Sequence, residues 1–128
     1  MQKKLSTDTA EKINFLRDFC YKESLNAGWH TNIETGELLE RNKGEMIALI
    51  HSEVSEMLEG ERKDLMDDKL KHRKMVEVEA ADAIIRIFDY CGRWGYDVGG
   101  AFVEKIKFNQ ERQDFKLENR AKEGGKKF

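Results

Sequence analysis

The sequence predicts an all-α protein, a four- to five-helix bundle assembled as a homo-oligomer. The chain of 128 residues contains no proline and is rich in glutamate and lysine. Proline is the commonest helix breaker, and the abundant residues favour helices. Apolar residues make up 39% of the chain and charged residues 38%, so the core must come from well-patterned helices. This length suits one domain with a single modest core.

The first helix is expected to begin within residues 6–8, because the Ser, Thr and Asp side chains there can each cap exposed backbone amides. Apolar residues follow at helical spacing: Ile13, Leu16, Phe19 and Cys20. Gly28 is a suitable helix end. A loop comes next, in which Thr35-Gly36 marks a turn and weakly signals a short hairpin.

A second helix is expected over residues 45–62. Its apolar residues share one broad face at 100° per residue: Met46, Ile47, Ile50, Val54, Met57 and Leu58. Glu53 falls inside this apolar arc, and Glu56 lies at its edge. A solvated glutamate is not usually placed inside such an arc, so Glu53 is a candidate functional residue.

A charged connection over residues 63–74 leads to a third helix, expected over residues 75–94. One wide apolar face of this helix contains Val76, Ala80, Ala81, Ile84, Ile87, Phe88 and Cys91. Glu79 and Asp82 lie on the opposite side. Helical spacing alone does not distinguish a functional cleft from an ordinary solvated face there.

A fourth helix, capped by Asp97, is expected to reach Phe115, although Gly99-Gly100 weakens its first turn. One stripe of this helix carries Lys105, Asn109 and Arg112. Residues 116–128 form a tail that is too polar to fold alone. The predicted helical domain therefore spans residues 1–115.

The composition argues against two classes of partner. The net charge of −2 comes from 23 basic and 25 acidic residues that are well mixed along the chain. This pattern does not favour binding to DNA or RNA polymers or to anionic membranes. No apolar stretch resembles a signal peptide or a membrane span. Cys20 and Cys91 lack metal-type spacing, so both are expected to be reduced core thiols of a cytoplasmic protein.

Two acidic pairs have the same spacing. Glu53 and Glu56 are three residues apart, as are Glu79 and Asp82, so each pair presents two carboxylates in one direction on its helix. A short connection favours antiparallel packing of the two helices, which would bring the pairs together. Four carboxylates in a partly buried cleft would repel one another unless a divalent cation were bound.

The ligands would all be oxygen atoms, which suits Mg²⁺, or alternatively Mn²⁺, better than zinc. Magnesium commonly completes its coordination with substrate phosphates, so the site points to phosphoryl chemistry. The side chains of Lys105, Asn109 and Arg112 are of the types that would bind a polyphosphate.

These motifs resemble the all-α nucleoside triphosphate pyrophosphatases, the superfamily that includes MazG and the dimeric dUTPases. The resemblance covers roughly residues 25–115 and rests on Glu53-x-x-Glu56, Glu79-x-x-Asp82 and three segments: HSEVSEMLEG, EAADAIIRIFDYCGR and EKIKFNQER. The short single-domain MazG-like proteins of bacteria and phages are the most similar type. For a phage-encoded chain, the expected location would be the host cytoplasm.

The resemblance implies Mg²⁺-dependent hydrolysis of a nucleoside triphosphate to the monophosphate and pyrophosphate. It implies three sets of site residues: Glu53, Glu56, Glu79 and Asp82 as metal ligands; Lys105, Asn109 and Arg112 as phosphate-binding residues; Trp29 and His30 as a base pocket. Either Glu53 or Glu56 would also orient or deprotonate the attacking water. The chain departs from its relatives at Gly99-Gly100, where they often have acidic or helix-favouring residues.

Two other classes of function remain open at this stage. A di-metal carboxylate bundle of the di-iron type also gathers acids from packed helices, but it usually needs Glu-x-x-His motifs, which neither acidic pair provides. A non-catalytic helical interaction module is the other class, and the intact set of four acids argues against it. The wide apolar faces of the middle helices predict a homodimer or a dimer of dimers.

Overall fold

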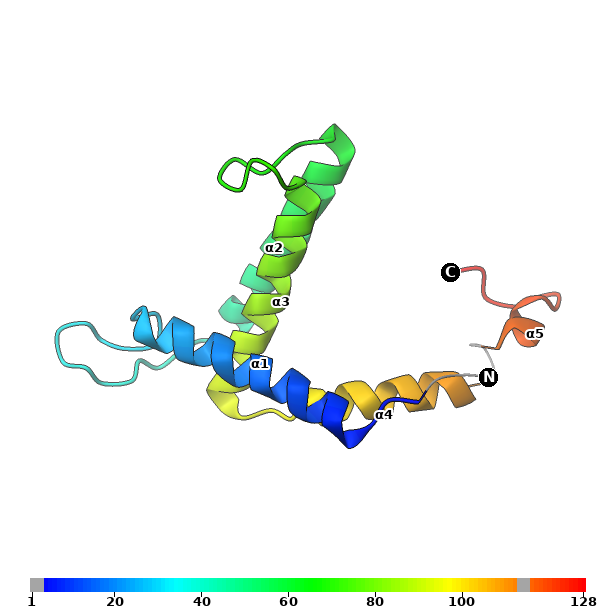
Figure 1. Ribbon diagram of the computed structural model, residues 1–128, viewed down its shortest axis with the longest axis horizontal. Helices are drawn as coiled ribbons and strands as arrows, with labels where there is room; N and C mark the ends of the chain where they lie inside the picture. The colour runs from blue at the N-terminus through cyan, green and yellow to red at the C-terminus, as the bar shows by residue number, and fades with distance from the viewer. Residues whose placement is uncertain (1–3, 113–115) are drawn as a thin grey trace. The chain divides into compact units, whose positions relative to one another are not determined.

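The computed structural model describes residues 4–112 and 116–128, and every regular element within them is a helix (Figure 1). In chain order the helices are α1 (Thr7–Asn26), α2 (Lys43–Lys63), α3 (Met75–Trp94), α4 (Val98–Glu111) and α5 (Leu117–Arg120). The prediction of an all-α chain is confirmed. The chain divides into two compact units, one formed by Leu16–Tyr96 and the other by Met1–Phe15 with Asp97–Phe128.

In the Leu16–Tyr96 unit, α2 and α3 pack side by side as an antiparallel helical hairpin (Figure 1). The buried residues of α2 are Met46, Glu53 and Gly60, which are spaced two helical turns apart and so form one stripe. At Gly60 a Cβ atom would lie 2.9 Å from the Cβ of Met75. Glycine at this position therefore allows the end of α2 to meet the start of α3 closely.

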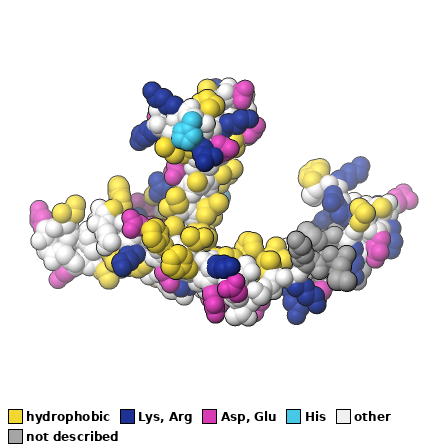
Figure 2. Space-filling model, in the orientation of Figure 1, with side chains coloured by type: hydrophobic (Ala, Val, Ile, Leu, Met, Phe, Trp, Pro, Cys, Tyr) yellow, Lys and Arg dark blue, Asp and Glu magenta, His cyan; other side chains and the backbone are white. Residues whose placement is uncertain are grey.

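The stripe that α2 turns toward α3 is not the centre of its apolar face. Ile47, Val54 and Leu58 are 41%, 50% and 59% exposed, because they lie about 100° or more around the helix from Met46 and Glu53. These residues of the shared apolar face are therefore not buried within this unit. On α3, Ile84 is likewise exposed, and Figure 2 shows hydrophobic side chains at the surface along this hairpin.

Both long connections of this unit are ordered by hydrogen bonds. In the loop after α2, the buried carboxylate of Asp67 accepts hydrogen bonds from the amides of Lys69 and Leu70 at 3.0 and 2.7 Å. In the loop before α2, an antiparallel bridge pairs Thr31 with Leu38. Gly36 has a φ of +75° in that turn, which confirms the weakly signalled hairpin.

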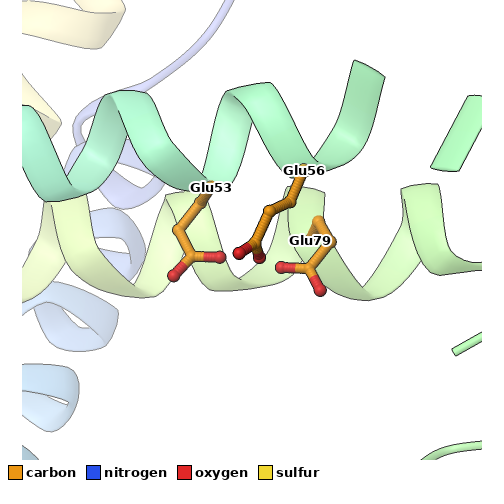
Figure 3. Close-up of side chains that lie close together, drawn as sticks. All are labelled: Glu53, Glu56 and Glu79. Atoms are coloured by element: carbon orange, nitrogen blue, oxygen red, sulfur yellow. The ribbon is translucent and has the colours of Figure 1, made fainter. Parts of the chain in front are cut away.

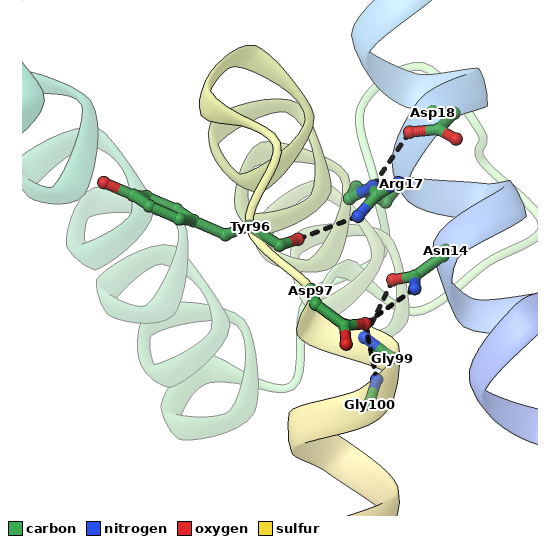
Figure 4. Close-up of polar contacts among 7 residues, drawn as sticks. All are labelled: Asn14, Arg17, Asp18, Tyr96, Asp97, Gly99 and Gly100. Atoms are coloured by element: carbon green, nitrogen blue, oxygen red, sulfur yellow. Dashed lines mark hydrogen bonds and ion pairs between the residues drawn. The ribbon is translucent and has the colours of Figure 1, made fainter. Parts of the chain in front are cut away.

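Helix α1 approaches α3 closely at Gly92. A Cβ atom on this glycine would lie 2.5 Å from the Cβ of Tyr21 and 3.0 Å from the carbonyl oxygen of Arg17. The Arg17 guanidinium also donates to the carbonyl oxygen of Tyr96, at 2.9 Å (Figure 4). These contacts hold the second half of α1 along α3. Together with α2, the two helices line the cavity described below.

In the other unit, Asn14 of α1 holds the start of α4 (Figure 4). Its amide donates to Asp97 Oδ1 at 2.8 Å and accepts from the Gly99 amide at 2.8 Å. Asp97 Oδ1 also accepts from the Gly100 amide, as a helix cap. Gly99 is buried, and a Cβ there would collide with the carbonyl oxygen of Ala10. The glycine that weakens this helix in isolation is therefore required for its contact with α1.

Helix α4 is shorter than predicted. It ends at Glu111, and the backbone of Arg112 is extended, with a ψ of 136°; the predicted continuation to Phe115 falls on residues 113–115, outside the described residues. The polar tail contains a helical turn, α5, contrary to expectation. The Arg120 side chain stabilises this turn by donating to the carbonyl oxygens of Lys126 and Lys127. No helix in the described ranges has both the length and the apolar character needed to cross a membrane.

Candidate metal centre

Three glutamates meet between α2 and α3. Glu53 and Glu56 extend from α2 and Glu79 from α3, with their carboxylates turned toward one another (Figure 3). One carboxylate oxygen from each residue lies within 4.8 Å of the other two. The i, i+3 spacing places Glu53 and Glu56 on one face of α2, and the antiparallel hairpin brings Glu79 opposite them.

Glu79 is the most strongly perturbed member of this cluster. It is half-buried, and its Oε2 atom is enclosed without a hydrogen-bond partner among the described residues. Burial, together with the neighbouring carboxylates of Glu53 and Glu56, raises the pKa of Glu79 to about 8. Glu79 therefore holds a proton at neutral pH, and this proton stands in for the positive charge that the cluster lacks.

Glu53 has the opposite shift. Its residue is 8% exposed, and burial alone would raise its pKa, but the contacts with Glu79 and Arg86 outweigh burial and lower it. Arg86 Nε donates to Glu53 Oε1 at 2.8 Å. Glu53 is thus the ionised carboxylate of the cluster, and Arg86 is the cation that balances it.

Asp82, the fourth predicted ligand, lies at the edge of the cluster. Its carboxylate is half-buried and does not belong to the group of three whose oxygens converge. Burial, followed by the charge of Glu53, raises its pKa, while the positive charge of Arg86 opposes this rise. Asp82 therefore interacts with the cluster electrostatically, one helical turn beyond Glu79.

A cavity of about 850 Å³ opens beside the cluster, between α1, α2 and α3. Glu53, Asp82 and Arg86 line it near the cluster, and Trp29, Arg41 and Asp89 also line it. A volume of this size is typical of small-molecule sites. The carboxylates in its wall outnumber the two arginines, so the cavity has a negative lining.

The two residues of the predicted base pocket lie in different environments. Trp29 lines the cavity and is 69% exposed, whereas His30 is fully buried and is not part of the cavity wall. His30 Nε2 contacts Asp89 Oδ1 at 2.8 Å, and Ser24 Oγ donates to Asp89 Oδ2 at 3.2 Å. His30 therefore contacts the cavity only through Asp89.

The predicted phosphate-binding stripe belongs to the other unit. Lys105 is exposed, and its Nζ lies 4.8 Å from the ring centroid of Phe108. Asn109 is half-buried, and its Oδ1 is enclosed without a partner among the residues described. Arg112 follows the end of α4. Their role in phosphate binding stays a prediction.

Sequence reasoning did not assign functions to Arg86 and Asp89. A signal for both was present, because Asp82, Arg86 and Asp89 have the i, i+4, i+7 spacing of one helical stripe. Ser24 carried no such signal. It joins this group only because α1 crosses α3 at Gly92.

The donor set fits a hard divalent cation. Carboxylate oxygens are the ligands that magnesium and manganese prefer, and the enclosed Oε2 of Glu79 has no hydrogen-bond partner within the described ranges. None of the three histidines supplies a ligand to the cluster: His30 bonds Asp89, while His51 and His72 are exposed. The arrangement can hold one or more oxygen-coordinated cations at the end of a cavity large enough for a nucleotide.

Comparison of the chain with protein families, with curated proteins and with solved structures found no match. The resemblance to MazG-like proteins therefore stays a prediction from the sequence motifs. The candidate site is supported only by the geometry of its own residues.

Proposed function

We propose that this protein is a Mg²⁺-dependent nucleoside triphosphate pyrophosphohydrolase that converts a ribo- or deoxyribonucleoside triphosphate to the monophosphate and pyrophosphate. The principal support is the convergence of Glu53, Glu56 and Glu79, together with the enclosed oxygen of Glu79 that has no partner in the described part of the chain. A cluster that holds a proton at neutral pH in place of a cation is suited to exchange that proton for Mg²⁺ or Mn²⁺.

Bound magnesium would neutralise charge on the phosphoryl oxygens and lower the pKa of water. Glu79 releases its proton when the cation binds. Arg86 keeps Glu53 ionised but also makes it a weaker base, since it lowers the pKa of that carboxyl. Glu56 is exposed to solvent and is therefore the better placed of the two to orient the attacking water and accept its proton.

The cavity accounts for substrate binding in this proposal. The acids of its lining outnumber the two arginines, so a free triphosphate would be repelled, whereas a triphosphate bound to a divalent cation would not. Arg86 makes its contact with Glu53 through Nε, so its terminal nitrogens are directed to other acceptors, such as phosphate oxygens. Asp82 would complete the metal site as its outer ligand.

The protein is also proposed to work as a homo-oligomer, a dimer or a dimer of dimers. Only Met46 and Ala83 are buried apolar residues in the described part of the chain, while Val54, Leu58 and Ile84 are at least half exposed. A second copy packed on these faces would remove them from water. Light scattering at micromolar concentration tests this, and a stable monomer would contradict it.

The activity is tested by incubating the protein with Mg²⁺ and a panel of canonical triphosphates while measuring monophosphate and pyrophosphate together. Equal amounts of both products are expected. Glu53→Gln should abolish turnover with little loss of folding, because the amide keeps the shape of the side chain but not its charge. Glu61→Gln, which changes an exposed acid of the same helix, is the matched control and should retain full activity.

Three other results would reject the proposal in different ways. Release of orthophosphate and diphosphate would place cleavage at a different bond. Tightly held iron after purification would favour the di-metal carboxylate bundle. Absence of turnover with every triphosphate would favour the non-catalytic interaction module, which would be cytoplasmic like the proposed enzyme.

A further inference from the structure

Asp89 lines the same cavity as the metal centre but lies at its other end. It follows Asp82 by seven residues on α3, a separation of ~10 Å along the helix. On the antiparallel helix α2, Glu45 precedes Glu53 by eight residues and lines the same distant end. The cavity therefore extends from the three-glutamate cluster to Asp89.

The carboxylate of Asp89 is held in one orientation. Ser24 Oγ donates to Oδ2 at 3.2 Å, and His30 Nε2 lies 2.8 Å from Oδ1. A carboxylate only accepts hydrogen bonds, so Nε2 is the protonated nitrogen of this contact. His30 is itself immobilised, because it is fully buried and its carbonyl oxygen accepts from the Leu39 amide at 2.8 Å.

Asp89 retains acceptor capacity toward the cavity. A carboxylate can accept about four hydrogen bonds, and Ser24 and His30 supply one to each oxygen. The side chain is 18% exposed, and it forms part of the cavity wall. A ligand in the cavity would therefore meet a fixed pair of acceptor oxygens, which favours a ligand edge carrying two adjacent donors.

We propose that Asp89 binds the nucleobase and selects the 2-amino-6-oxopurine edge of guanine nucleotides. This inference rests on the proposed function, which places the triphosphate at the glutamate cluster. Guanine alone among the common bases presents a ring N–H beside an amino group, which matches a carboxylate in a two-bond contact. Adenine and cytosine place a ring acceptor beside the amino group, and uracil flanks its N–H with two carbonyls.

The distance along α3 favours the base over the sugar as the partner of Asp89. Ribose hydroxyls lie close to the phosphates, whereas the outer edge of a purine lies farthest from them. Trp29 and Phe19 are exposed aromatic residues in the lining, and such rings can stack on a base without selecting it. The fixed carboxylate of Asp89 is therefore the group that would select the base.

The test compares GTP with ITP, which lacks only the 2-amino group. The value of kcat/KM is expected to be about 10- to 100-fold higher for GTP, the effect of one hydrogen bond to a charged acceptor. Asp89→Asn should lower the GTP value to near that of ITP, and should lower the ITP value less, because hypoxanthine donates only its ring N–H to this side chain. Ser24→Ala should lower the preference in part, and Asp68→Asn, an exposed acid in a loop, should leave it unchanged.

A binding measurement separates this inference from the proposed function. GMP and IMP are titrated into the Mg²⁺-loaded protein by calorimetry, with the same variants. Tighter binding of GMP that is lost in Asp89→Asn supports the inference even if no triphosphate is hydrolysed, in which case only the proposed function fails. Equal kcat/KM values and equal affinities for guanine and hypoxanthine nucleotides would overturn the inference. So would a preference for ribose over deoxyribose that depends on Asp89, because this would assign the carboxylate to the sugar.

Discussion

Glu79 and Asp89 are acids of the same helix, ten positions apart, but their surroundings are opposite. Glu79 faces two other carboxylates and has an enclosed oxygen without a partner among the described residues. It holds a proton at neutral pH because burial and its neighbours raise its pKa to about 8. Asp89 has a donor on each oxygen, from Ser24 and His30. At the first site the acids outnumber the one neighbouring cation, Arg86, whereas the second site has its donors in place.

This difference separates two uses of a carboxylate. Neighbouring carboxylates without hydrogen-bond donors lower the stability of the fold, and a bound cation offsets their repulsion. A carboxylate that is fixed by its own donors costs little and can recognise the donors of a ligand without rearranging. The cavity joins these two sites, so the comparison can be tested at either end.

The largest expected effect is on metal binding at the Glu79 end. Glu79→Gln removes the only α3 carboxylate of the converging group, and Mg²⁺ or Mn²⁺ affinity should fall by at least about 100-fold. Calorimetric titration measures this loss. Asp89→Asn should change metal affinity less than about threefold if the two ends are independent. Equal losses in both variants would contradict the separation of roles.

The pH dependence of metal binding should be the next largest effect. Because Glu79 must lose its proton, the apparent affinity should rise by about tenfold per pH unit from pH 6 to pH 8 and level off above that range. Calorimetry in buffers of different ionisation enthalpy should show nearly one proton released per cation at pH 6.5. Binding that is independent of pH in this interval would show that Glu79 is already ionised.

A smaller effect is expected on the stability of the metal-free protein. The folded chain keeps the Glu79 proton up to pH about 8, whereas the unfolded chain loses it near 4.5, so stability falls as pH rises between these values. At pH 5 the free energy of unfolding of Glu79→Gln should be close to that of the parent protein. At pH 9 it should exceed the parent's by on the order of 1–2 kcal/mol, after allowance for solvent screening.

Urea unfolding with chelator present measures this difference, and Glu61→Gln is the control. A variant that is less stable than the parent at pH 9 would argue against repulsion within the cluster. Added Mg²⁺ should reverse the order, because it stabilises only the parent.

The smallest effect should come from Arg86, which competes with a cation for Glu53. Arg86→Met should raise Mg²⁺ affinity by roughly two- to fivefold, since the pair is partly exposed. The same variant should weaken nucleotide binding, because a phosphate ligand is lost. Calorimetry with metal alone and with the metal–nucleotide complex gives both values. Arg62→Met, which changes an exposed residue of α2, is the control and should leave both affinities unchanged. Lower affinity of Arg86→Met for metal alone would exclude the competition, and higher affinity for the metal–nucleotide complex would exclude the phosphate contact.

Much of the fold follows from local sequence features. The absence of proline and the helical spacing of apolar residues predicted the helices, and the third helix was predicted with its observed bounds, Met75–Trp94. The side chains of Asn42 and Asp97 cap α2 and α4 by accepting hydrogen bonds from backbone amides of the first turn. The largest errors in helix bounds came at the chain's polar end, where α4 is shorter than expected and the tail contains α5.

The candidate site was only partly predictable. The i, i+3 spacing of Glu53 and Glu56 fixed their common direction, because a helix determines its own geometry. The orientation of Glu79 toward α2 was not fixed, since the apolar face of α3 is so wide that several rotations of the helix would bury similar residues. His30 was predicted beside the ligand and instead lies behind Asp89, because the loop after α1 folds back against α3.

The sequence by itself determined the helices, their caps and the paired acids, all of which depend on residues within a few positions of one another. The tertiary structure decided which acids are unsatisfied and which are partnered. That outcome depends on where glycines such as Gly60 and Gly92 allow helices to approach within van der Waals contact, and such contacts between distant residues leave no periodic signal in the chain. The same close approaches give the cavity one end where carboxylates converge and another where a carboxylate is held by its own donors.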